Sequence, residues 1–316
     1  MLAREVIQRV RQIQIRTGRQ VADVLAGEYV SVFRGTGVEF EEVRPYIPGD
    51  DVRSIDWNVT ARVGQPFVKR YVEERQLTLM LVADISSSQD FGSATRSKRE
   101  ATAELCALLA FSAIRNDDKV GLVLFHGDVE QYIPPRKGQK HVLRVIREVL
   151  AHGHEQADPL PAGKRRWPWG RTRSRQSARA ATSINAAMTF LMKVAKRKTV
   201  CFVISDFLDQ GFERAMAAAN RKHDVIAVHV SDHRERSLPD VGLIELVDAE
   251  TGKRRLYDTG SDTFRQSHQR LTGQRFESLD RRFRANGIDL VHIDSVGSIA
   301  DSLVKFFRLR ERRMRR

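Results

Sequence analysis

The stretch LTLMLVADISSS, residues 77–88, decides the fold of this chain. Its first half is apolar at nearly every position, and it is far shorter than the roughly 20 residues that a membrane-spanning helix needs. A short continuous apolar run of this kind predicts a strand that is buried on both faces of a parallel sheet. The run ends at Asp84, and Ser86 and Ser88 follow it at once.

Asp84, Ser86 and Ser88 place one carboxylate and two hydroxyls directly after the predicted strand. In an open α/β sheet, ligands bind just beyond the carboxyl ends of the strands. Hard oxygen ligands of this type suit Mg²⁺, Mn²⁺ or Ca²⁺. The pattern Asp-x-Ser-x-Ser at this place resembles the metal-ion-dependent adhesion site (MIDAS) of von Willebrand factor A domains. The alternative is a strand that simply runs into a serine-rich turn.

The composition is that of a basic protein with enough apolar residues for a core. The chain has 316 residues, of which 41% are hydrophobic, and this suits one large domain or two ordinary ones. Its net charge of +14 favours acidic partners such as nucleic acid, an anionic membrane surface or an acidic protein face. Cys106 and Cys201 lie in apolar segments and are expected to be buried thiols. Because no signal peptide or membrane span is evident, we expect a cytoplasmic protein.

Apolar strand patterns alternate with helical patterns along the rest of the chain. This alternation predicts an α/β fold over residues 77–310, with a doubly wound, mostly parallel sheet and helices on both faces. Residues 3–25 show the spacing of an amphipathic helix, and residues 311–316 are expected to form a frayed basic tail. The further strands are expected at 119–127, 129–134, 199–207, 223–232 and 288–295, the helices at 95–115, 137–150, 181–197, 210–221, 261–286 and 298–310, and a peripheral hairpin at 243–258.

Residues 31–76 are rich in turn-forming residues and also in aromatic ones. A solvated linker would not hold so many aromatic side chains in water. We therefore expect residues 1–76 to comprise the N-terminal helix and an ordered extension, which packs on the main domain through aromatic anchors and Arg–carboxylate pairs.

The extension also carries a spaced set of residues that resembles a family signature. The set runs from Gly35-x-Gly37-x-Glu39-Phe40 to Ala61-Arg62. It resembles the signature of a bacterial domain-of-unknown-function family, DUF58, where it stands directly before a von Willebrand A-like domain. The resemblance is tight over residues 31–88 and looser beyond. The signature positions are Glu39, Arg44, Tyr46, Gly49, Asp50, Asp51, Arg53, Asp56, Trp57 and Arg62.

Two later loops resemble the remaining metal loops of von Willebrand A domains. Thr182 lies at the start of the helix expected at 181–197, where it suits an N-cap position, and its hydroxyl corresponds to one that reaches the ion. Asp206 ends the strand expected at 199–207. The resemblance thus implies a metal site made of Asp84, Ser86, Ser88, Thr182 and Asp206. Phe207 stands where the family usually has glycine, so the sequence leaves the local turn open.

The resemblance implies a function in metal-dependent protein binding. The ion would be Mg²⁺, with Mn²⁺ or Ca²⁺ as alternatives, and a carboxylate from a partner would fill its open position. The implied partner is a MoxR-type AAA+ ATPase, for which this chain would be an adaptor in protein assembly or remodelling. The residues themselves argue against several enzymes: Ser86 replaces the second aspartate of a phosphoaspartate hydrolase, and neither a Gly-Lys-Ser/Thr loop nor a Gly-x-Ser-x-Gly motif occurs.

Two other functions stay open at this point. Residues 152–180 read as a flexible basic insertion in which tryptophans stand among the charges, a composition that can bind nucleic acid or another anionic surface. A merely solvated loop accounts for them equally well. A metal-assisted hydrolase would need a general base near the ion. The candidate anion-binding residues are Lys164, Arg165, Arg166, Arg171, Arg173 and Arg175.

Overall fold

The computed structural model describes residues 12–13, 25–33, 37–74, 76–93, 96–151, 182–247 and 253–315. The chain divides into two compact units. Residues 33–77 form the extension unit, and the residues before and after them form the main unit. Helix α2 (Ala26–Val32) therefore belongs to the main unit, although the predicted boundary placed it with the extension.

The main unit is built on a six-stranded sheet with the order β10-β7-β6-β3-β4-β5. All neighbouring strands are parallel except β4 and β5 at one edge. The chain moves outward from β3 through β4 to β5, and it then returns to the other side of β3 with β6, so the strand order reverses between β3 and β6. The strands are β3 (Thr78–Asp84), β4 (Lys119–Phe125), β5 (Val129–Arg136), β6 (Val200–Ser205), β7 (Asp224–Ser231) and β10 (Asp289–Asp294).

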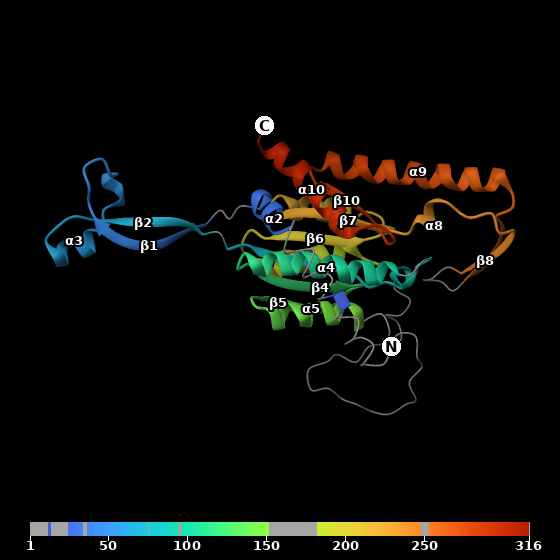
Figure 1. The fold of residues 1–316 in the computed structure, drawn as a ribbon, viewed down its shortest axis with the longest axis horizontal. Coiled ribbons are helices and arrows are strands. Elements are labelled where there is room, and N and C mark those ends of the chain that lie inside the picture. The colour runs from blue at the N-terminus through green and yellow to red at the C-terminus, as the bar shows by residue number, and fades with distance from the viewer. Residues whose placement is uncertain are drawn as a thin grey trace, which may run out of the picture. The chain divides into compact units, whose positions relative to one another are not determined.

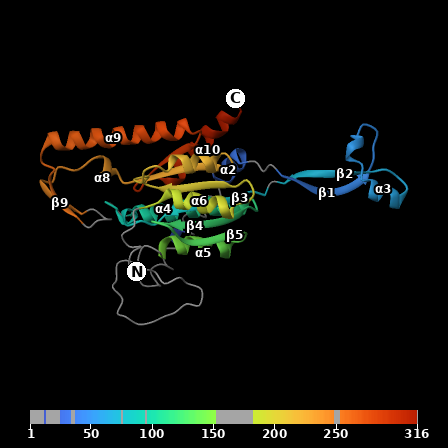
Figure 2. The same cartoon turned by 180° about the vertical axis from the view of Figure 1, so that it is seen from behind.

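Helices cover both faces of this sheet, as Figures 1 and 2 show from opposite sides. Met80 and Val82 of β3 join a core cluster with residues of α6, α7 and α9, whereas α4 packs against β3 and β7 with α2, α5 and α10 beside it. The predicted fold class, an α/β fold with a mostly parallel sheet, is confirmed. The helices are α4 (Lys98–Arg115), α5 (Gln139–Ala151), α6 (Ile184–Val194), α7 (Glu213–Asn220), α8 (His233–Arg236), α9 (Asp262–Ala285) and α10 (Ile299–Met314).

Several predicted features of the main unit are confirmed, and two segments differ. Cys106 and Cys201 are free, buried thiols, and β8 (Leu243–Val247) pairs with β9 (Arg254–Asp258) as the predicted hairpin. The sequence predicts that strand β5 ends at Pro134, but it continues to Arg136, because it is an edge strand and an irregularity in its pairing accommodates the prolines.

The prediction of a frayed basic tail at residues 311–316 is wrong as far as Met314, because helix α10 continues to that residue. The ion pair between Arg313 Nη1 and Asp289 Oδ1, at 2.7 Å, ties this last turn to β10.

Two predicted segments fall outside the described residues. The N-terminal helix expected at 3–25 is described only at residues 12–13, which are helical, and at residue 25. The basic insertion, with all six of its candidate anion-binding residues, is not described. Among the described residues, no helix is both long enough and apolar enough to cross a membrane.

The extension unit is an antiparallel hairpin with a folded tip. Strand β1 (Gly37–Pro45) pairs with β2 (Phe67–Glu74). A short 3₁₀ helix, η2 (Val52–Ser54), and helix α3 (Trp57–Val63) lie between the two strands. The expectation that this segment is ordered is therefore confirmed for residues 37–74.

Candidate metal centre

The loop after β3 and the end of β6 bring four of the predicted site residues together. Ser86 Oγ lies 2.9 Å from Ser88 Oγ, and Ser88 Oγ donates a hydrogen bond to Asp206 Oδ2 at 2.7 Å. The backbone N–H of Ser86 donates to Asp84 Oδ1 at 2.8 Å. These residues lie where the strand order reverses, which is the usual place of ligand sites in such sheets.

Asp84 is buried, and both of its carboxylate oxygens accept hydrogen bonds. Besides the Ser86 amide, the Ser205 hydroxyl donates to Asp84 Oδ2 at 2.7 Å. Burial, followed by repulsion from the Asp206 carboxylate, raises the pKa of Asp84 to about 7, although hydrogen bonds from Ser205 and Ser86 act in the opposite direction. The ionised form of Asp84 is thus costly in this fold, and a nearby cation would stabilise it.

The raised pKa of Asp84 predicts how the stability of the metal-free protein depends on pH. Since an unfolded aspartate has a pKa of about 3.9, the folded state binds more protons between about pH 4 and pH 7. The contribution of Asp84 to the free energy of unfolding therefore falls as the pH rises through this window, and it is constant above about pH 7. We expect Asp84→Asn to remove this fall, as measured by urea unfolding in EDTA at about pH 5 and about pH 8. If the difference in the free energy of unfolding between wild type and variant is equal at both pH values, the raised pKa of Asp84 is contradicted.

The loop that carries Ser86 and Ser88 is held in place by α4. The guanidinium of Arg99 is buried, and its Nη2 donates to the backbone oxygens of Ile85 and Ser86, each at 3.3 Å. Its Nε pairs with Asp90 Oδ1 at 2.6 Å. Gly92 lets the loop turn back toward α4, because a Cβ there would lie 2.6 Å from the Ser97 Cα. The backbone of the loop that carries Ser86 is therefore held by contacts with α4.

Lys98 supplies a buried positive charge beside the cluster. Its side chain is 1% exposed, and its Nζ lies 3.1 Å from Asp206 Oδ2 and 2.8 Å from Glu235 Oε1. Burial alone would lower the pKa of Lys98, but the carboxylates of Asp206 and Glu235 outweigh this effect and raise it. The ammonium group thus balances the charge of Asp206 from inside the protein.

Thr182 lies at the same edge of the sheet, although the hydrogen bonds described above do not include it. It is buried, and the backbone N–H of the next residue, Ser183, donates to the carbonyl oxygen of His126 just after β4. The prediction that Thr182 caps the helix is wrong, because Ser183 is the N-cap of α6 and accepts a hydrogen bond from the Ala186 amide. Thr182 is buried at this edge, and its role as a metal ligand stays a prediction.

The turn after Asp206 keeps the backbone that glycine would favour. Phe207 has a φ of 50°, which is the left-handed region that non-glycine residues rarely adopt. Its ring is buried and packs against Phe212 and Phe283, with centroids 5.5 and 5.0 Å away. The turn that the sequence left open is therefore formed, and the burial of the ring offsets the backbone strain.

The chemistry of the oxygen cluster fits a small divalent cation. Mg²⁺ binds oxygens at about 2.0–2.1 Å in an octahedron, so neighbouring ligand oxygens lie about 2.9 Å apart. The spacings of 2.9 Å between the serine hydroxyls and 2.7 Å from Ser88 to Asp206 are close to this value. Within the described ranges, no group of three or more His, Cys, Asp or Glu side chains could hold a metal ion. A cation at this edge would thus depend on the serine hydroxyls.

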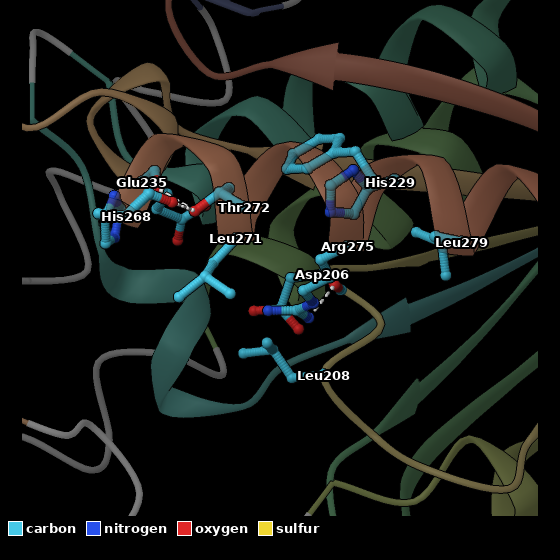
Figure 3. Close-up of a pocket in the computed structure, with 10 residues that line it drawn as sticks. Asp206, Leu208, His229, Glu235, His268, Leu271, Thr272, Arg275 and Leu279 are labelled. Carbon is cyan, nitrogen blue, oxygen red and sulfur yellow. Dashed lines mark hydrogen bonds between the residues drawn. The ribbon is translucent and has the colours of Figure 1, made fainter. Parts of the chain in front are cut away.

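A pocket of about 310 Å³ opens beside this cluster and shares Asp206 with it (Figure 3). Helix α9 forms one wall, and the turn after β6, strand β7 and helix α8 form the rest. The Nη2 of Arg275 donates to the backbone oxygens of Asp206 and Phe207, each at 3.4 Å. The lining residues are Asp206, Leu208, His229, Glu235, His268, Leu271, Thr272, Arg275, Phe276 and Leu279.

Most of the charged signature residues build the tip of the extension unit. Arg44 forms two hydrogen bonds with the Asp50 carboxylate, at 2.8 and 2.6 Å, and Asp50 also accepts one from the Ile47 amide. Asp51 caps η2, and Asp56 caps α3. Tyr46 donates through its backbone N–H to Pro66, and Gly49 has a φ of 111°.

The remaining signature residues lie on the surface or are described only by their backbone. Arg53 and Arg62 are exposed, and Glu39 is described only as part of β1. Trp57 is 66% exposed. It occupies the first turn of a short helix that buries none of its residues.

We expect Arg44→Gln to loosen the turn between β1 and η2. The hydrogen bonds from Arg44 lower the pKa of Asp50, and the variant loses both of them. Amide exchange at Ile47 and Asp50 should become faster, by up to roughly fivefold, because an exposed ion pair stabilises only modestly. Hydrogen–deuterium exchange by mass spectrometry measures this, with Arg53→Gln as the control. Unchanged exchange in Arg44→Gln would show that the pair does not hold the turn.

Sequence reasoning missed the residues that surround the oxygen cluster. Lys98 and Arg99 read only as part of the helix expected at 95–115, and their local sequence gave no signal of a buried site. Ser205 directly precedes Asp206, so it offered a weak signal. Glu235 and Arg275 carried none, because they come near the site only through the tertiary fold.

Comparisons with known proteins give relatives without an assigned function. The chain is 29% identical over 304 residues to "Uncharacterized protein Rv1480" of Mycobacterium tuberculosis, which covers 96% of this chain and 89% of that protein. It is 28% identical over 118 residues to "Uncharacterized protein YeaD" of Bacillus subtilis, covering 37% of this chain and 27% of that protein.

Two solved structures match this chain at low sequence identity. The conserved hypothetical protein BatB from Bacteroides thetaiotaomicron has a TM-score of 0.42 and 15% identity, over 75% of this chain and 99% of that one. The SpRpn10 VWA domain has a TM-score of 0.37 and 12% identity, over 72% of this chain and 93% of that one. The family model described as "Protein of unknown function DUF58" matches residues 42–277. This chain therefore belongs to the DUF58 family.

Proposed function

We propose that this protein is a non-enzymatic adaptor that binds a protein partner through a divalent metal ion. The observation that carries the proposal is the cluster of Asp84, Ser86, Ser88 and Asp206 at the point where the strand order reverses. Two hydroxyls and a carboxylate at these spacings suit Mg²⁺, and Mn²⁺ or Ca²⁺ are alternatives.

Each residue of the cluster has a distinct part in this proposal. Ser86, Ser88 and Asp206 would hold the ion, with Thr182 as a further candidate. Asp84 would act from behind them, because both of its oxygens already accept hydrogen bonds from Ser86 and Ser205. A bound ion with so few protein charges would supply an electrophilic position for a carboxylate of the partner. The proposal contains no catalytic step, and Ser86 stands where a phosphoaspartate hydrolase would need an aspartate.

The proposed partner is a MoxR-type AAA+ ATPase in the cytoplasm, which the resemblance to the DUF58 family suggests. The net charge of +14 supports a partner with an acidic face, since complementary charge speeds association and favours the correct partner. The adaptor would then link the ATPase to the proteins that it assembles or remodels.

A binding assay with the purified MoxR-type ATPase of the same organism tests the proposal. Immobilised wild-type protein should retain the ATPase in Mg²⁺ and lose it in EDTA, and Ser88→Ala should not retain it in either. Ser302→Ala, a hydroxyl replacement on α10, is the matched control and should behave as wild type. Equal retention with and without the metal would contradict the proposal. If a nucleic-acid probe is retained by the same immobilised protein regardless of EDTA but is lost in high salt, the function belongs to basic residues instead.

A further inference from the structure

The pocket beside Asp206 is lined by Arg275, which forms no direct ion pair among the described residues. The carboxylates of Asp206 and Glu235 attract its guanidinium from a longer distance. Among the ion pairs of the described residues, Lys98 engages both nearby carboxylates, Asp206 and Glu235. Arg275 forms no ion pair with a carboxylate in that part of the chain; its Nη2 donates only to two backbone oxygens at 3.4 Å. A guanidinium with weak partners at a pocket wall is suited to a carboxylate, which it can bind through two parallel hydrogen bonds.

The same pocket also has exposed apolar residues. Leu208 is 50% exposed and Leu271 is 62% exposed, and Figure 3 shows both near Asp206 and Arg275. Exposed apolar side chains beside a charged group can pack against an aliphatic side chain of a bound segment. His229 adds no charge to the pocket, because burial, followed by repulsion from His292, keeps its pKa well below the ordinary value.

We propose that this pocket binds an acidic segment of the protein partner, with a carboxylate on Arg275 and an aliphatic side chain against Leu208 and Leu271. The inference rests on the proposed function and deepens it. Because the pocket and the oxygen cluster share Asp206, a partner that brings one carboxylate to the ion places its neighbouring residues here. The positive charge of the chain favours the same occupant. Recognition would then require two acidic groups separated by an apolar residue.

The test is a cycle with two short peptides and two protein variants. The probes are N-acetyl-Asp-Leu-Glu-amide and N-acetyl-Asp-Leu-Gln-amide, which differ by one carboxylate. Dissociation constants come from the ¹³C-methyl resonances of Leu208 and Leu271, recorded in Mg²⁺ and again in EDTA. The variants are Arg275→Gln and, as the matched control, Arg281→Gln, an exposed arginine of the same helix that does not line the pocket.

We expect the acidic peptide to shift both leucine methyl resonances. Arg275→Gln should weaken its binding by roughly tenfold, and the glutamine peptide should lose no further affinity in this variant, since the two changes remove the same contact. Arg281→Gln should bind as wild type. Equal affinity of wild type and Arg275→Gln, or leucine resonances that do not move, would overturn the inference. Titration with Mg²⁺ alone separates the two proposals. Arg275→Gln should bind the ion at least as tightly as wild type. If wild type does not bind the ion, the proposed function is contradicted, and the peptide measurements in EDTA then test the pocket by itself.

Discussion

Replacing Lys98 by methionine is expected to tighten Mg²⁺ binding by roughly tenfold or more and to destabilise the metal-free protein. The Lys98 ammonium lies 3.1 Å from Asp206 Oδ2, the same oxygen that accepts the hydrogen bond from Ser88. A cation bound at the serine hydroxyls would share Asp206 with this ammonium, and the two positive charges would repel each other. Removing the ammonium of Lys98 therefore favours binding of the cation.

The same substitution removes the internal counter-ion of a buried carboxylate. Asp206 and Lys98 are both buried, and breaking a buried ion pair from one side costs about 3–5 kcal/mol in the free energy of unfolding. Mg²⁺ should restore much of this loss, since a ligand that binds only the folded state stabilises it. The combined expectation is a lower stability in EDTA together with a larger stabilisation by Mg²⁺ than in wild type.

Calorimetric titration and urea unfolding measure both effects. Lys137→Met is the matched control, because Lys137 pairs with the exposed Asp117 and lies on the connection between β5 and α5. It should leave both quantities within error of wild type. If Lys98→Met folds but binds Mg²⁺ more weakly than wild type, Lys98 supports the metal site rather than competing with the ion.

The second large effect is expected at Phe207, where glycine should be tolerated better than alanine. Phe207→Ala removes a buried ring and should cost about 3–5 kcal/mol in the free energy of unfolding. Phe207→Gly loses the same ring, but glycine adopts the φ of 50° without strain. We therefore expect the glycine variant to be more stable than the alanine variant by about 1 kcal/mol.

Phe212 provides the control for this comparison. It is buried in the same aromatic cluster, but its φ of −74° is ordinary. There alanine should be the more stable replacement, because glycine loses more conformational freedom on folding. Urea unfolding of the four variants measures both differences. The same order of glycine and alanine at the two positions would contradict the argument from backbone strain.

The parts of the fold that could be predicted from the sequence are those marked by a local pattern of apolar residues. Buried strands such as β3 and β6 appear as short apolar runs, and their ends mark Asp84 and Asp206 without any knowledge of the sheet. The position of Thr182 shows the limit of this approach. Two adjacent hydroxyl residues could each cap α6, and only the backbone geometry selects Ser183.

The missed parts depend on contacts between distant segments. Lys98 meets Asp206 and Glu235 across 108 and 137 residues of sequence, so no local spacing could indicate the buried ammonium. Within the extension unit, polar pairs such as Arg44–Asp50 hold the tip, and the side chain of Trp57 is exposed, although an aromatic residue in a turn-rich segment favours burial.

The most direct test of the account is a titration of the metal-free protein with Mg²⁺. The account predicts that wild type binds the ion at one site, that Ser88→Ala binds it at least roughly tenfold more weakly, and that Ser302→Ala is unchanged. No binding to folded wild type at millimolar Mg²⁺, or equal binding by Ser88→Ala, would contradict the claim that the cluster at the ends of β3 and β6 is a metal site.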